Sequence, residues 1–185
     1  MLAHDADDDG LPPPWTSGGH SMKRSATISP DGVYRYDLIR EWDDRPRLLW
    51  CMLNPSVADG HINDTTTRRC IQMSESWGYG GLTLVNLFGV RSQDPSRLFD
   101  HPDPVGPAND DYIVRHASTH PTVVVGWGSY GQYFPDRVTK VVRLLSAHYT
   151  TLHCIGLTSG GQPRHPRFSV GQLVVWVPLP DYVVK

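Results

Sequence analysis

The chain has 185 residues, 39% of them hydrophobic, and its 19 Asp and Glu residues slightly outnumber its 17 Lys and Arg residues. Such a composition is ordinary for a globular protein, and the length fits a single domain. No apolar run approaches the ~20 residues that span a bilayer, and the first residues lack the basic-then-apolar pattern of a signal peptide. We therefore expect a cytoplasmic protein without a membrane partner.

Residues 1–21 differ in composition from the rest of the chain. They include Asp5, Asp7, Asp8 and Asp9, no Lys or Arg, and many Pro, Gly and Ser residues. A stretch of this kind cannot bury enough apolar surface to fold, so we expect a disordered tail followed by one α/β domain over 22–185. Without the tail the chain is slightly basic, and charge alone neither establishes nor excludes a nucleic-acid partner.

The three cysteines, Cys51, Cys70 and Cys154, are widely spaced and lie in apolar segments. The sequence contains no Cys or Cys/His pair at the spacing of a zinc site. We expect reduced cysteines in the core, no metal site and no cofactor.

The regular elements follow from periodicity. Residues 26–40 predict a β-hairpin around Pro30-Asp31-Gly32, because residues 33–39 alternate with the period of two typical of a strand. Apolar runs predict buried strands over 48–53, 82–85, 122–125 and 152–157, and residues 173–177 can add an edge strand. Helical spacing predicts helices over 65–77, with Asp64 as N-cap, and over 108–117 and 135–147. The alternation predicts a three-layer α/β/α sandwich with a mainly parallel central sheet, preceded by an N-terminal β-hairpin.

Polar clusters stand where three of the predicted strands end. Asn54-Pro55-Ser56 follows the first buried strand, Asn86 ends the second, and His165 lies in the loop after the last. Ligands of open α/β sheets bind outside the carboxyl ends of the strands. We therefore expect the side chains of Asn54, Asn86 and His165 to converge on one crevice.

These residue types suit the chemistry of a nucleobase. An amide carries both a donor and an acceptor, so Asn86 can pair with the carbonyl and N–H of a pyrimidine edge. Asn54 can hold a water, and His165 can donate to a developing anion or contact a phosphate. Asp59 is the carboxylate that can activate a water, whereas Asp64 fits a helix cap. For each residue the alternative is a structural turn amide or a solvent-exposed side chain.

Further residues flank the expected crevice. Phe88, Trp127 and Tyr130 can stack on a base, although core packing is the commoner fate of aromatic side chains. Contacts to phosphate or DNA are expected from hydroxyl and guanidinium groups, which can equally be solvated surface groups. The candidates are Ser56, Arg68, Arg91, Thr158, Ser159, Arg164 and Arg167.

Nearly the whole chain from Tyr34 to Pro178 resembles a family of uncharacterised bacterial and phage domains. The resemblance rests on a series of short motifs, of which the second is one residue longer than the family pattern. The motifs are Met52-Leu53-Asn54-Pro55-Ser56, Asp64-Thr65-Thr66-Thr67-Arg68-Arg69, Trp77-Gly78-Tyr79, Val85-Asn86-Leu87-Phe88, Trp127-Gly128 and Pro163-Arg164-His165-Pro166.

More distantly, the order of the motifs resembles that of the uracil-DNA glycosylase superfamily. Those enzymes have a Gly-x-Asn-Pro or Gly-x-Asp-Pro motif, an Asn ending the next strand and a His-Pro-Ser loop. The resemblance implies a similar fold, in which Asn54 positions the attacking water, Asn86 reads the base, and His165 stabilises the departing base or holds a phosphate. This chain lacks the preceding Gly, has an amide that cannot take a proton at position 54, and has Arg167 where the Ser would stand.

The leading hypothesis is a hydrolase that cleaves the N-glycosidic bond of a damaged or modified base in DNA, most readily a pyrimidine, in repair or phage defence. Its partner would be DNA, either single-stranded or with the base flipped from a duplex, and it would act as a monomer. Two alternatives keep the fold. One is an enzyme that processes free nucleotides or nucleosides, and the other is a non-catalytic module that binds modified DNA.

Overall fold

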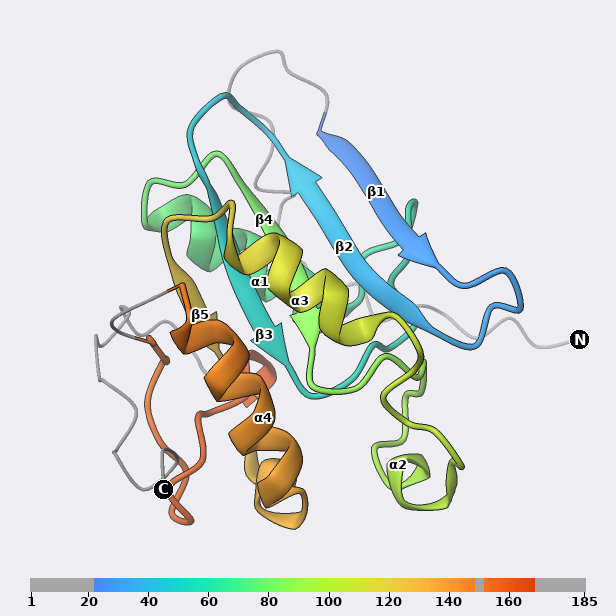
Figure 1. Cartoon of the computed structure of the whole chain (residues 1–185). Helices are drawn as coiled ribbons and strands as arrows, with labels where there is room; N and C mark the ends of the chain where they lie inside the picture. The colour runs from blue at the N-terminus through green and yellow to red at the C-terminus, as the bar shows by residue number, and fades with distance from the viewer. Residues whose placement is uncertain (1–21, 149–151, 169–185) are drawn as a thin grey trace, which may run out of the picture.

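A computed structural model describes residues 22–148 and 152–168 of the chain (Figure 1). The tail expected over 1–21 and the edge strand expected over 173–177 lie outside the described residues. None of the helices in the described ranges is long and apolar enough to cross a membrane.

The described residues form a mixed α/β fold. The strands are β1 (Lys23–Ile28), β2 (Arg35–Glu41), β3 (Arg47–Met52), β4 (Gly81–Asn86) and β5 (Val123–Val125). The helices are α1 (Thr65–Ser76), α2 (Arg97–Asp100), α3 (Asn109–Ala117) and α4 (Pro135–Ser146), with short 3-10 helices η1 (Ser129–Tyr133) and η2 (Pro166–Phe168). The predicted hairpin, the first three buried strands and the three long helices are confirmed, whereas α2, η1 and η2 were not expected.

The five strands form one sheet in the order β1-β2-β4-β3-β5. β1, β2 and β4 pair antiparallel, whereas β4, β3 and β5 run parallel. The prediction of a fourth parallel strand over 152–157 is wrong for the described residues, which contribute one parallel bridge between Val124 and His153. Gly156 has a φ of +124°, so the backbone leaves the extended conformation soon after that bridge.

Helices pack on both faces of the sheet (Figure 1). Leu49, Cys51 and Val85 point to the face covered by α3 and α4. Their neighbours Trp50 and Leu84 point to the other face, where they pack on α1. This division follows from the two-residue period of a strand. Apolar residues at successive positions of β3 and β4 are therefore buried on both faces, as predicted from their continuous apolar runs.

The cysteine side chains are all buried and free of disulfide bonds, as expected. Cys51 belongs to the core on the α3–α4 side, Cys70 to the core on the α1 side.

A β-bulge in β2 breaks the regular alternation expected for residues 33–39. Thr27 of β1 pairs with Asp37 and Ile28 pairs with Arg35, so Tyr36 is an extra residue on β2. Asp37 contacts His116 of α3, with 2.8 Å between Oδ2 and Nε2. Regular alternation would place Arg35 on that same face, but its Nη1 instead donates to the carbonyl of Ala58, in the core on the α1 side. The bulge therefore turns Arg35 towards α1.

Candidate functional site

A cavity of about 310 Å³ opens at the carboxyl ends of the parallel strands. Its position follows from the strand order, because β4 lies on one side of β3 and β5 on the other. Such a reversal of strand order leaves a crevice in which α/β proteins bind ligands. The lining residues that carry polar groups include Arg35, Asn54, Ser56, Asp64, Thr66, Thr67, Asn86, Ser92, Gln93, Tyr130, His165 and Arg167.

Asn86 ends β4 with its side chain in this cavity, and the residue is only 1% exposed. Asn109 of α3 donates from Nδ2 to the backbone carbonyl of Asn86 over 3.0 Å. Arg137 of α4 donates from Nε to the next carbonyl, that of Leu87, over 2.6 Å. Helices α3 and α4 thus hold the end of β4 from the face of the sheet opposite the Asn86 side chain. The Nδ2 of Asn86 is buried and has no hydrogen-bond partner in the described part of the chain, which is rare in native proteins.

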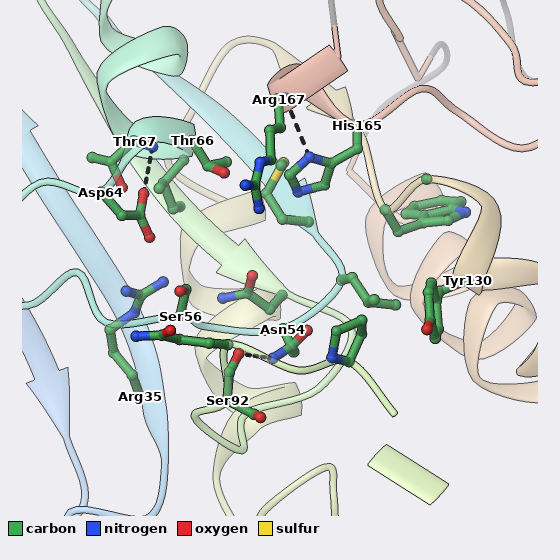
Figure 2. A pocket seen from close by; sticks show the side chains of 18 of the residues that line it. Arg35, Asn54, Ser56, Asp64, Thr66, Thr67, Ser92, Tyr130, His165 and Arg167 are labelled. Carbon is green, nitrogen blue, oxygen red and sulfur yellow. Dashed lines mark hydrogen bonds between the residues drawn. The ribbon is translucent and has the colours of Figure 1, made fainter. Parts of the chain in front are cut away.

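Asn54 lies in the turn after β3, where Pro55 fixes the direction of the backbone. Its Nδ2 donates to the carbonyl of Ser92 over 2.9 Å (Figure 2). The same Nδ2 donates to the carbonyl of Pro55 over 3.1 Å. Because both contacts use the nitrogen, they set the orientation of the amide. Its oxygen, Oδ1, is then the atom that can accept a hydrogen bond from a water or a ligand in the cavity.

His165 enters the cavity from the loop that precedes η2 (Figure 2). The backbone N–H of Arg167 donates to Nδ1 of His165 over 3.2 Å. Burial lowers the pKa of His165 to about 4, so the ring is neutral at pH 7. With Nδ1 acting as acceptor, the proton of the neutral ring is on Nε2. His165 therefore presents an N–H donor.

Two glycines give this loop the space that it needs beside the end of β5. A Cβ on Gly126 would lie 3.1 Å from the carbonyl oxygen of Arg164, and a Cβ on Gly128 would lie 3.1 Å from the Cβ of His165. Gly128 also has a φ of +73°, in the left-handed region that favours glycine. The Trp127-Gly128 motif thus permits the close approach of the histidine loop.

Arg35 and Asp64 line the same cavity, although neither was predicted as a site residue. Asp64 caps α1 as expected, since its Oδ1 accepts from the backbone N–H of Thr67 over 2.7 Å. Sequence patterns indicated only the cap, because the second oxygen of the carboxylate has no sequence signature. Arg35 was missed because the bulge at Tyr36 determines which face it occupies.

The aromatic end of the cavity is formed by Trp127 and Tyr130. The indole Nε1 of Trp127 donates to Oε1 of Gln162 over 2.8 Å, which fixes the position of the ring. Because the N–H group is used in this way, a ligand can contact the ring only by packing on it. Phe88 does not reach the cavity. It is 2% exposed and packs edge-to-face on Phe134 in the core, so the prediction that Phe88 stacks on a base is wrong.

Several predicted site residues lie outside the cavity lining. Asp59 is occupied in a turn, where its Oδ1 accepts from the backbone N–H groups of His61 and Ile62. Arg91 donates to the carbonyl of Gly32, and Arg164 donates to that of Leu157. The other three, all outside the lining, are Arg68 on α1 and Thr158 and Ser159 in the turn before the histidine loop.

The structure therefore brings together seven of the predicted residues: Asn54, Ser56, Asn86, Trp127, Tyr130, His165 and Arg167. The described residues contain no group of three His, Cys, Asp or Glu side chains that could hold a metal ion.

Residues 35–167 match a family described as a protein of unknown function (DUF1643). The chain belongs to this family. The matched region contains every element from β2 to the histidine loop, and hence all the lining residues of the cavity. No curated protein and no solved structure matches the chain significantly.

The cavity of this DUF1643 domain combines fixed donors with few charges. Asn86 and His165 supply neutral donors, and Asn54 supplies a neutral acceptor. The charged side chains of the lining are Arg35, Arg167 and Asp64. A site of this composition suits a polar, planar ligand better than a purely apolar one.

Proposed function

We propose that this protein is a DNA glycosylase-like hydrolase with a three-layer α/β/α sandwich resembling that of the uracil-DNA glycosylases. Its substrate would be a nucleotide with a damaged or modified base, most readily a pyrimidine, flipped out of a duplex or taken from a single strand. The observation that carries the proposal is the orphaned Nδ2 of Asn86, which is buried in the same cavity as His165.

The reaction assigns a task to each neutral group. When the N-glycosidic bond breaks, its electron pair leaves with the base, and the sugar becomes an oxocarbenium ion. Asn86 Nδ2 and the Nε2–H of His165 donate to the base as its negative charge grows, so they stabilise the transition state more than the ground state. A water that donates to Oδ1 of Asn54 attacks the sugar and then loses its proton to solvent.

This route needs no general base at position 54. The sequence left Asp59 as a candidate water-activating group, but Asp59 lies outside the cavity lining. Asp64 is a carboxylate of the lining, but one of its oxygens caps α1 and the other points towards Arg35 and Ser56 (Figure 2). A dissociative reaction, in which the bond to the base is largely broken before water attacks, is therefore the mechanism that we infer for this lining.

The experiment is incubation with oligonucleotides that each carry one modified base, single-stranded and duplex, followed by alkaline cleavage at abasic sites. We expect scission at the modified position and a loss of at least ~100-fold in rate for Asn86→Ala, the usual cost of a donor at a developing anion. Gln132→Ala, which removes an exposed amide outside the lining, is the matched control. Full activity of a folded Asn86→Ala protein would exclude the base-reading role.

A free nucleoside or nucleotide is the second candidate substrate, and one observation favours it. Five of the seven residues predicted to grip DNA, namely Arg68, Arg91, Thr158, Ser159 and Arg164, lie outside the cavity lining. Release of base from monomeric nucleosides, together with DNA affinity that is weak even at low salt, would support this candidate over the first.

A further inference from the structure

One end of the cavity contains a buried cation that the proposed reaction does not use. Arg35 is 3% exposed, and its Nε is buried with no hydrogen-bond partner among the described residues. Burial lowers the pKa of Arg35 to about 10, against the favourable charge of Asp64, so the guanidinium is still charged at pH 7. Its Nη1 donates to the carbonyl of Ala58 over 2.5 Å, which fixes the plane of the group. A desolvated, unsatisfied guanidinium is costly, and a ligand would offset the cost.

Asp64 faces the same end of the cavity from the start of α1. One carboxylate oxygen is committed to the helix cap, and the other points into the cavity towards Arg35 and Ser56 (Figure 2). The ion pairs found within the described ranges do not include one between Arg35 and Asp64. The two opposite charges thus face the same part of the cavity without forming an ion pair with each other.

We propose that Arg35 and Asp64 together bind an amide-type edge of the ligand, in which a carbonyl oxygen lies next to an N–H group. The carbonyl accepts from Arg35, and the N–H donates to the free oxygen of Asp64. The inference rests on the proposed function only in taking the ligand to be a nucleobase derivative. The edge belongs either to the base ring itself or to a carboxamide substituent on a modified base.

A phosphate fits this end of the cavity less well. The N-terminus of α1 and Arg35 would attract an anion, but the carboxylate of Asp64 already occupies the cap and would repel it. A ligand group with one acceptor and one donor satisfies both side chains, whereas an anion satisfies only the arginine.

The test measures binding of free deoxynucleosides by calorimetry, so it does not depend on turnover. The probes are deoxyuridine, deoxyuridine methylated on its ring N–H, the same methylated nucleoside with a carboxamide substituent, and inorganic phosphate. The variants are Arg35→Met, Arg35→Lys and Asp64→Asn, each checked by thermal unfolding. Asn caps helices as well as Asp does, so Asp64→Asn keeps α1 intact. Arg91→Met is the control, because the Nε of Arg91 is also buried without a hydrogen-bond partner in the described part of the chain, but lies outside the cavity lining.

We expect the wild type to bind at least one amide-bearing nucleoside, and Arg35→Met and Asp64→Asn each to weaken that binding at least tenfold. Arg91→Met should bind like the wild type. If methylation of the ring N–H abolishes binding, the ring supplies the edge. If the carboxamide restores it, the substituent supplies the edge.

Three results would overturn the inference. One is equal binding of all nucleosides by wild type and Asp64→Asn. Another is binding of phosphate that Asp64→Asn strengthens. The third is an Asp64→Asn protein that binds normally but loses turnover, which would assign Asp64 to proton transfer. Amide-dependent binding without any base excision would instead refute the glycosylase proposal and leave this inference standing.

Discussion

The backbone N–H of Arg167 donates to Nδ1 of His165 over 3.2 Å, and this contact fixes which nitrogen of the ring carries the proton. A backbone N–H group can only donate, so Nδ1 must accept and Nε2 must hold the hydrogen of the neutral ring. Burial then favours the neutral form, lowering the pKa to about 4. The histidine is thereby prepared as a donor before any ligand arrives.

The first prediction concerns this protonation state. In a ¹⁵N NMR titration, His165 should show the Nε2–H tautomer at pH 7 and should remain neutral down to about pH 5, titrating only near its folded pKa of about 4. The ordinary histidine pKa of ~6.5 is the reference for this titration. A resonance of His165 that titrates near that value would contradict the assignment.

The second prediction concerns the role of that donor in the proposed reaction. His165→Phe keeps a planar ring but removes the N–H, so the rate of base excision should fall by ~10²–10³, as for other donors to a developing anion. His165→Gln retains an amide donor and should recover part of the loss. Single-turnover rates measure both effects. Equal rates for the Phe and Gln variants would show that hydrogen bonding from this position is not used.

The third prediction concerns Arg40, which holds the loop between β3 and α1. The residue is fully buried, and its guanidinium donates to Oδ1 of Asn63 over 2.7 Å and to the carbonyls of Asp59 and Ile62 over 2.6 and 3.1 Å. Arg40→Met removes the donor to Oδ1 of Asn63 and to the carbonyl of Asp59, whereas the carbonyl of Ile62 still accepts from the backbone N–H of Asp59. We expect a loss of about 2 kcal/mol or more in the free energy of unfolding, at ~1–3 kcal/mol for each acceptor that stays buried.

Chemical denaturation of wild type, Arg40→Met and Arg40→Lys measures this loss. Lysine keeps the charge but lacks the planar fork, so it should recover little of the stability. Arg24→Met is the comparison, because the side chain of Arg24 is exposed and donates from Nη1 to the carbonyl of His61 in the same loop. Equal stabilities for Arg40→Met and Arg24→Met would mean that the buried contacts do not hold the loop.

The fourth prediction concerns stability in acid. His120 is 6% exposed, and its ring nitrogens lie 2.8 Å from the carbonyl of His116 and 2.9 Å from the hydroxyl of Thr83. Burial lowers its folded pKa to about 4 from an ordinary value of 6.5. As the pH falls, His120 therefore takes up a proton in the unfolded chain before it does so in the folded protein. The stabilisation that the folded protein gains from a neutral His120 is complete above pH ~6.5 and is lost as the pH falls towards 4. The lost free energy is at most about 3 kcal/mol.

Urea unfolding at pH 7 and at pH 4.5 checks this sign. His120→Gln should be less stable than wild type at pH 7 but should lose less stability on acidification. An unchanged pH dependence in His120→Gln would contradict the prediction.

The fifth prediction concerns thiol reactivity. Burial raises the pKa of Cys51 to about 12, and it raises those of Cys70 and Cys154 as well. Thiols react as thiolates, so the native protein should not react with a disulfide reagent at pH 8, whereas the unfolded chain should titrate all three residues. Rapid reaction of a thiol in the folded protein would show that the core opens locally.

Much of the fold could be predicted because its signals are local. The run over 48–53 is apolar at every position and the run over 82–85 at every position but Thr83, as expected of strands buried on both faces. Asp64 before a helical pattern predicted both the start of α1 and its cap. The convergence of Asn54, Asn86 and His165 followed from one rule about the carboxyl ends of strands.

The missed features depend on contacts between distant segments. Phe88 comes two residues after Asn86, yet it packs on Phe134 because the backbone continues past the sheet edge into the core. Asp59 and Asp64 both lie in the polar segment between β3 and α1. Only the folded conformation of this segment shows that Asp64, and not Asp59, lines the cavity. The run over 152–157 has strand-like residues, but Gly156 turns the chain away after one bridge.

The extra residue at Tyr36 means that strand pairing can matter as much as residue identity in this family. A relative with the same residues along β2 but without the bulge would carry its guanidinium on the α3 side of the sheet, beside the equivalent of Asp37. Such a protein could keep every other lining residue and still lose the cation of the cavity. Comparisons of relatives should therefore establish the pairing of this strand before they compare side chains.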